Sequence, residues 1–82
     1  MSLSETAVYS RLTEIFQSVF DEDDLVVTPN TTADDVSGWD SLTHVRLILT
    51  VSKTFGIKFS ASEISSFKNV GELATAISKK HN

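Results

Sequence analysis

The sequence predicts an all-α domain of three main helices and one short helix. Apolar residues recur at helical spacing in several segments, the clearest sign of amphipathic helices. Gly and Pro number only three and one, too few for a turn-rich β sandwich. A length of 82 residues suffices for one domain with one modest core, and we expect residues 1–82 to form that domain.

The first helix is expected over about residues 3–20. Ser2 and Glu5 fit a capping box at its start. Four acidic residues at 21–24 would lie unfavourably at the negative end of the helix dipole, so we expect the helix to end near Phe20. Its buried face is predicted from apolar residues at helical spacing, namely Val8, Leu12, Ile15, Phe16, Val19 and Phe20.

Residues 21–40 predict a long structured loop, because acids, threonines and one proline replace the helical pattern. A connection of this length in a compact domain is usually either functional or misassigned. Leu25 and Val36 are the expected anchors of the loop to the core. Trp39 either packs beneath the loop or contacts a bound group, and packing is the commoner role of an aromatic side chain.

The second helix is expected over residues 41–55, with Asp40 or Ser41 as its N-cap and Gly56 as its end. Its buried stripe is predicted from residues at helical spacing, namely Leu42, Val45, Ile48, Leu49, Ser52 and Phe55. On this prediction, Leu49→Ala removes a core side chain and destabilises the fold by about 2–5 kcal/mol.

Two further helices complete the expected fold. A short one over about residues 61–66 is predicted by a capping box from Ser60 to Glu63, with Ile64 facing the core. So short a helix needs tertiary contacts to persist. The last helix is expected over about residues 70–80, where the apolar positions at helical spacing are Val70, Leu73, Ala74 and Ile77.

Composition excludes several functions. The chain has no cysteine, which excludes disulfides, thiolate nucleophiles and zinc sites with sulfur ligands, so any working thiol must come from another group. Neither a secretory signal pattern nor an apolar run of about 20 residues is present. We therefore expect a cytoplasmic monomer without a membrane span.

The charge is unevenly distributed along the chain. The net charge of −4 argues against nucleic acid as a partner, because phosphate binding needs a concentrated basic surface. Residues 1–40 carry −8 and residues 41–82 carry +4. The acidic and basic halves of the sequence are thus distinct, although folding can interleave them.

The segment Gly38–Leu42 is the most informative motif, because its serine stands where a loop becomes a helix. We expect the Ser41 hydroxyl to be exposed. A helix N-terminus offers free N–H groups and a positive dipole end, which suits a phosphodiester on this serine. The alternative is that Asp40 and Ser41 only cap the helix, as such residues commonly do.

A hydrolase is the enzymatic alternative, because Asp40, Ser41 and His44 are the residue types of a catalytic triad. The pattern argues against it. No Gly-x-Ser-x-Gly turn surrounds Ser41, no second loop offers an oxyanion hole, and Asp40 is too close in sequence to orient the far side of His44.

The stretch from Thr31 to Ile77 resembles the acyl carrier and peptidyl carrier protein family. Asp40-Ser41-Leu42 matches its attachment motif, and Gly38 precedes the motif at the family spacing. Val45 to Phe55 reproduces the apolar pattern of its second helix. Later segments that also resemble the family are Phe55-Gly56-Ile57, Glu63-Ile64 and Val70-Gly71-Glu72-Leu73.

The resemblance implies a four-helix acyl-carrier-type bundle in which Ser41 receives 4'-phosphopantetheine from coenzyme A. A phosphopantetheinyl transferase makes the attachment, and Asp40 is implied to assist this magnesium-dependent step. The arm then carries an acyl or aminoacyl thioester from a loading ligase or transferase to a downstream synthase or transferase. Such a protein is a carrier, with no catalytic residue and no metal site of its own. Fatty acyl, polyketide, aminoacyl and D-alanyl carriers share this scaffold, so the cargo stays open.

The expected partner surface lies on the second helix and consists of Leu42, His44, Val45, Arg46 and Lys53. In the common carriers of fatty acid synthesis this helix is strongly acidic and meets basic patches on enzymes. Here residues 41–55 contain no Asp or Glu. Either the cations are merely solvated, or the partners present neutral or acidic surfaces.

Two questions stay open at this stage. The first is whether an apolar cargo enters the gap beneath the second and third helices, near Leu49, Ile64 and Leu73, as similar proteins allow for fatty acyl groups. The interpretation that competes with a carrier is a helical protein-interaction module in which Ser41 is only a helix cap.

Overall fold

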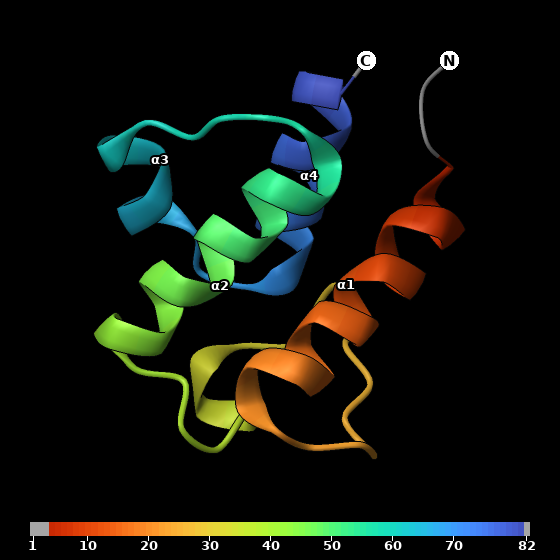
Figure 1. Cartoon of the computed structure of the whole chain (residues 1–82), viewed down its shortest axis with the longest axis vertical. Coiled ribbons are helices and arrows are strands. Elements are labelled where there is room, and N and C mark those ends of the chain that lie inside the picture. Colours follow the sequence, from red (N-terminus) through yellow and green to blue (C-terminus); the bar gives the residue numbers. More distant parts are fainter. Residues whose placement is uncertain (1–3, 82) are drawn as a thin grey trace.

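Three long helices surround one apolar core, and a short helix lies beside the second (Figure 1). The computed structural model describes residues 4–81, with the backbone alone at residue 81. The described residues form α1 (Glu5–Phe20), a 3-10 turn η1 (Ala33–Asp35), α2 (Ser41–Phe55), α3 (Ala61–Ser66) and α4 (Val70–His81). The all-α prediction is confirmed. The bounds predicted for α2 and α3 match, and α4 continues one residue further than predicted.

Helix α1 begins at Glu5, because the Ser4 hydroxyl caps it by accepting a hydrogen bond from the Ala7 N–H at 3.1 Å. The predicted start at residue 3 and the predicted Ser2 cap lie outside the described residues. The helix ends at Phe20 as predicted, with Asp21 in the left-handed region at φ 54°. Of the six apolar residues assigned to its buried face, Val19 and Phe20 are half-buried and the other four are buried.

The buried face of α2 differs from the prediction. Its buried side chains are Leu47, Ile48, Val51 and Phe55. The prediction was right for Ile48 and Phe55, but Leu42, Val45 and Leu49 are 78%, 48% and 58% exposed. Both faces of this helix are apolar, so spacing alone did not identify the one that meets the core. The predicted core role of Leu49 is therefore wrong.

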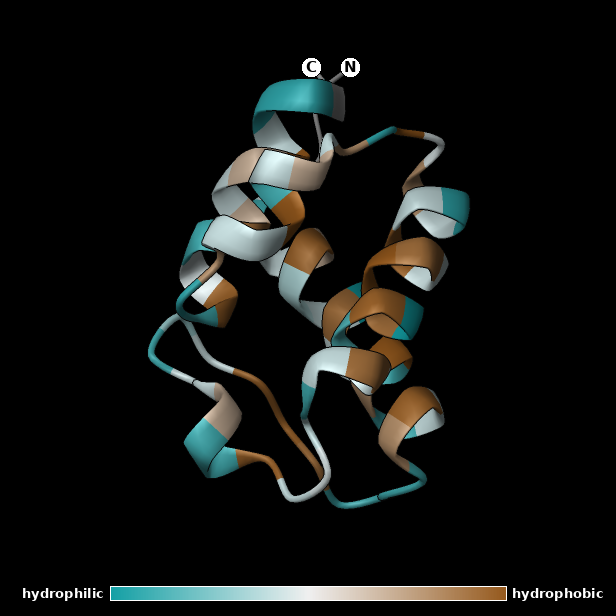
Figure 2. Ribbon diagram, turned by 90° about the vertical axis from the view of Figure 1, so that its left-hand side faces the viewer, coloured by the Kyte–Doolittle hydropathy of each residue, from teal (hydrophilic) through white to brown (hydrophobic). Residues whose placement is uncertain are grey.

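The loop between α1 and α2 is fastened to the core and to α4. Val36 is buried as predicted, whereas Leu25 is only half-buried and Val27 is the deeper anchor at 4% exposed. Figure 2 shows the apolar part of the loop that holds Leu25 and Val27, residues 25–27, between polar segments. The Val70 N–H donates to the Thr31 carbonyl at 2.9 Å, which joins the loop to the start of α4.

Side-chain caps explain where the last two helices begin. The Ser60 hydroxyl accepts from the Glu63 N–H at 3.2 Å, and the Glu63 carboxylate accepts from the Ser60 N–H at 2.9 Å, so the predicted capping box is confirmed. Asn69 supplies a similar contact for α4 by accepting from the Glu72 N–H at 2.9 Å. The core positions predicted in α4 are all buried. Among the described residues no helix is long and apolar enough to cross a membrane.

Candidate functional site: the N-terminus of α2

Ser41 is the first residue of α2, and its side chain is exposed. Asp40, not Ser41, is the N-cap: its carboxylate accepts from the N–H groups of Leu42 at 3.1 Å and Thr43 at 3.0 Å. Within the described residues no hydrogen bond occupies the Ser41 hydroxyl. The interpretation of Ser41 as a cap is therefore wrong, and its hydroxyl is free for another role.

Asp40 also limits how the start of α2 can bind a phosphodiester on Ser41. Two of the free N–H groups expected at this helix start, those of Leu42 and Thr43, already bind its carboxylate, so these two are not available to a phosphate on Ser41. The dipole of α2 still favours a nearby anion. The hydrogen bond from the backbone N–H of Thr43 is the largest of the contributions that hold the pKa of Asp40 below its ordinary value.

Thr43 fixes the loop in front of the helix. Its hydroxyl donates to the Gly38 carbonyl at 2.7 Å and accepts from the Asp40 N–H at 2.8 Å. Gly38 lies at φ 87°, where a residue with a side chain would be strained. These contacts set the direction in which the chain enters α2 and so the position of Ser41. The sequence analysis did not single out Thr43, although a threonine three residues after an N-cap was the available signal.

Trp39 packs beneath the loop, the commoner of its two predicted roles. Its ring meets Phe16 edge-on at 5.2 Å and lies 6.1 Å from Phe20, measured between ring centroids. Its indole N–H donates to Nδ1 of His44 at 3.0 Å, and the two ring planes are within 21° of parallel with centroids 6.0 Å apart. The aromatic contacts therefore connect α1, the loop and the first turns of α2.

A hollow of about 450 Å³ opens beside Ser41. The residues that define this Ser41 hollow are Trp39, Ser41, His44, Val45, Ile64 and Phe67. Of the residues expected around a cargo gap, Ile64 lines the hollow, whereas Leu49 faces solvent and Leu73 is buried in the core. An apolar surface thus begins at the serine itself.

The geometry is not that of a hydrolase. Nδ1 of His44 is engaged by Trp39, and Nε2 lies 2.7 Å from the carbonyl oxygen of Ile64. Neither ring nitrogen is available to take a proton from the Ser41 hydroxyl. Asp40 contacts the backbone of α2 rather than the imidazole. The three triad residue types are therefore close in sequence but not arranged as a triad.

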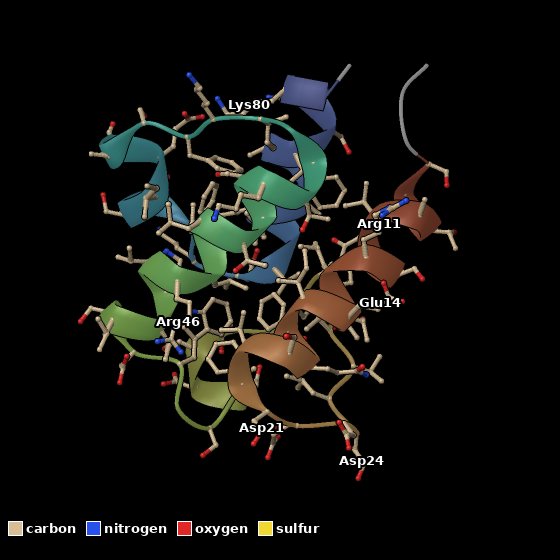
Figure 3. The ribbon with its side chains drawn as sticks, in the orientation of Figure 1. Arg11, Glu14, Asp21, Asp24, Arg46 and Lys80 are labelled. Atoms are coloured by element: carbon tan, nitrogen blue, oxygen red, sulfur yellow. The ribbon has the colours of Figure 1, made fainter. Side chains whose placement is uncertain are left out.

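The other residues of the predicted partner surface lie on the exposed face of α2. Leu42, Val45, Arg46 and Lys53 are exposed, and Leu49 adds a third apolar side chain to the same stripe. Figure 3 places Arg46 on α2, while Asp21 and Asp24 lie where the chain leaves α1. His44 differs from the rest, because it is half-buried and faces α3.

The fold and the exposed serine define a carrier protein, a class that holds a group covalently and catalyses nothing itself. The chain belongs to the phosphopantetheine-attachment family of carriers, because the family model described as "Phosphopantetheine attachment site" matches residues 10–77. A similar solved structure is the solution NMR structure of the holo acyl carrier protein from Geobacter metallireducens, with 44% identity and a TM-score of 0.83. The match covers 89% of this chain and 84% of that chain. No curated protein matches this sequence.

Membership of this family means that the protein bears a covalent 4'-phosphopantetheine arm, added by a phosphopantetheinyl transferase. The residues at the head of α2 fit such a group. The Ser41 hydroxyl is exposed and unpartnered among the described residues, and the hollow beside it has room along an apolar wall. The arm supplies the thiol that this cysteine-free chain lacks.

Proposed function

We propose that Ser41 carries the arm and that the protein transports an acyl or aminoacyl cargo as a thioester between enzymes. One observation supports this most: the Ser41 hydroxyl stands exposed at the first position of a capped helix and makes no hydrogen bond within residues 4–80. Asp40 holds the helix start in place by its two hydrogen bonds, which leaves the serine accessible to a transferase. Its assistance to a transferase-bound magnesium is part of the same proposal.

Incubation with coenzyme A and a promiscuous phosphopantetheinyl transferase, followed by mass spectrometry, tests the attachment. The wild type should gain one phosphopantetheine group, and Ser41→Ala should gain none while keeping its helical content, because Asp40 provides the cap. Ser37→Ala is a matched control, since Ser37 is exposed in the loop just before the site. An unmodified wild type would overturn the assignment and favour the interaction module, whereas a modified Ser41→Ala would show that the arm is attached to another residue.

The proposal extends to the partner surface, the exposed stripe of Leu42, Val45, Arg46, Leu49 and Lys53. At about 100° per residue these five side chains fall within about 100° of arc on α2, so one enzyme surface can meet all of them. Three exposed apolar side chains beside two cations, on a helix with no carboxylate, match an apolar depression flanked by neutral or acidic groups. His44 contributes at most its exposed edge.

The partners in this proposal are a loading ligase or acyltransferase and a downstream synthase or transferase of fatty acid, polyketide, lipid or related biosynthesis. A specialised acyl carrier fits best, because the stripe lacks the acidic character of general fatty-acid-synthesis carriers. The proposal takes residues 1–82 as a single monomeric carrier domain acting in the cytoplasm. Comparison of acyl-loading rates among candidate ligases would identify the cargo class.

A further inference from the structure

His44 stands apart from the exposed stripe because it joins three segments of the chain. The indole N–H of Trp39 is only a donor, so Nδ1 of His44 must accept at 3.0 Å. Nε2 therefore carries the ring proton and donates to the Ile64 carbonyl at 2.7 Å. We refer to this connected set, Trp39 to His44 to Ile64, as the His44 bridge.

The bridge matters because α3 has few other anchors. None of its side chains is buried, and a helix of six residues is not stable on its own. Its ion pair, Glu63 with Lys80 at 3.0 Å, is partly exposed and contributes little. The Ile64 carbonyl belongs to the last turn of α3, which lacks helical partners. Among the described residues, its bond to His44 is the one hydrogen bond between α3 and the N-terminal half of α2.

Protonation must break one of the two bonds. A proton from water that binds at Nδ1 turns both ring nitrogens into donors, so the Trp39 N–H loses its acceptor and faces another N–H, whereas Nε2–H still donates to the Ile64 carbonyl. The charged groups that line the same hollow are Asp40, the cap of α2, and Lys68, which follows α3. On the side of α1, Trp39 contacts the apolar rings of Phe16 and Phe20.

We propose that His44 is a positioning residue: as the neutral imidazole it holds both Trp39 and α3, and on protonation it releases Trp39 while its Nε2–H keeps α3 against the start of α2. The bridge forms one wall of the hollow next to Ser41, so its state sets the shape of that hollow. In the loaded carrier the arm would meet this wall, a consequence that rests on the proposed attachment at Ser41. The His44 bridge itself does not depend on an attached arm.

The test uses unmodified protein, so it is decided whether or not Ser41 is the attachment residue. Trp39 is the only tryptophan in the sequence, and its indole is hydrogen-bonded to the His44 ring, with the two ring centroids 6.0 Å apart. Its fluorescence is therefore a direct probe of the bridge. Emission is recorded through the range in which imidazole titrates, about pH 5 to 8. Amide hydrogen exchange of α3, corrected for the intrinsic effect of pH, is measured alongside.

Three variants test whether His44 is the group that causes a change of emission with pH. His44→Gln keeps one acceptor and one donor but cannot titrate, so its emission and its α3 exchange should be independent of pH. His44→Ala removes both contacts, and its α3 amides should exchange roughly 2- to 12-fold faster than wild type at pH 8, the factor for one net hydrogen bond. His81→Gln removes the other histidine of the sequence and should retain the wild-type transition.

The expected wild-type result is one transition in emission, with α3 exchange no faster at the acidic end, because the protonated ring still donates to the Ile64 carbonyl. If His44→Ala does not fold, the wild type and His44→Gln still decide the matter. A wild type whose emission does not change with pH overturns the proposal. So does a transition that persists in His44→Gln, or one that disappears in His81→Gln.

Discussion

Two leucines of α2 allow the buried face of this helix to be tested with one chemical change. Leu47 is fully buried and Leu49 is 58% exposed, although they are only two residues apart. Leu47→Ala leaves a cavity in the core and should cost about 2–5 kcal/mol. Leu49→Ala removes a side chain with less than half of its surface buried, which should cost about 1 kcal/mol or less.

The difference is large relative to the whole fold, because a domain of this length has a total stability of roughly 4–12 kcal/mol. Each kcal/mol shifts the melting temperature of so small a domain by about 4–8 °C. Leu47→Ala should therefore lower it by at least about 8 °C, and Leu49→Ala by less than about 8 °C. Thermal and urea unfolding measure both variants. Equal losses, or a greater loss for Leu49→Ala, would refute the assignment of the two faces.

Three further predictions follow from the site, the stripe and the loop. Replacing both Arg46 and Lys53 by Glu should improve malonyl transfer to the pantetheinylated protein by a general malonyl transferase, most clearly at low salt. The proposed partners would be contradicted if the wild type accepted malonyl groups as efficiently as an acidic-helix carrier and the double variant showed no gain. Asp40→Ala should destabilise the fold. Because the pKa of Asp40 is lowered in the folded state, its contribution to stability is present above the unfolded pKa of about 3.9 and disappears as pH falls through the folded pKa. The stabilities of wild type and variant should therefore converge in acid unfolding. A difference in stability that stays constant to pH values below the folded pKa would show another cause. Gly71→Ala should lower the melting temperature even though alanine favours helices, because a Cβ there would lie 2.8 Å from the Pro29 carbonyl oxygen. A higher melting temperature would show that the loop moves away from the added methyl group without loss of stability.

Helix positions were predictable because their signals are local. The capping box at Ser60 and the left-handed glycine at position 56 act over a few residues, and both appear in the structure as the sequence indicated. The orientation of α2 was not read correctly, because leucines and valines occupy opposite sides of it. At about 100° per residue Arg46 and Lys53 lie beside Leu42 and Leu49 on the helix, and this was the signal that those two leucines are exposed.

At the candidate site, the position of Ser41 followed from its sequence context, but the roles of its neighbours did not. Asp40 and Thr43 share one cap, and which of several polar residues caps a helix depends on its side-chain rotamer. The contact between His44 and Ile64 spans 20 residues of sequence and requires α3 to be in place. Pairings over such a separation leave no periodic trace in a single sequence.

The attachment of the loop to α4 has a consequence for the order of folding. The carbonyls of Pro29 and Thr31 accept hydrogen bonds from the N–H groups of Gly71 and Val70, about 40 residues further along the chain. Closing so long a segment costs entropy before any contact forms, and α1 and α2 can grow locally without it. We therefore expect these two bonds to be among the last contacts to form. The part of the loop from Pro29 to Thr31 then becomes fixed only after the far end of the chain has docked, whereas the contacts of Trp39 and Thr43 beside Ser41 lie within the first 55 residues and can form earlier.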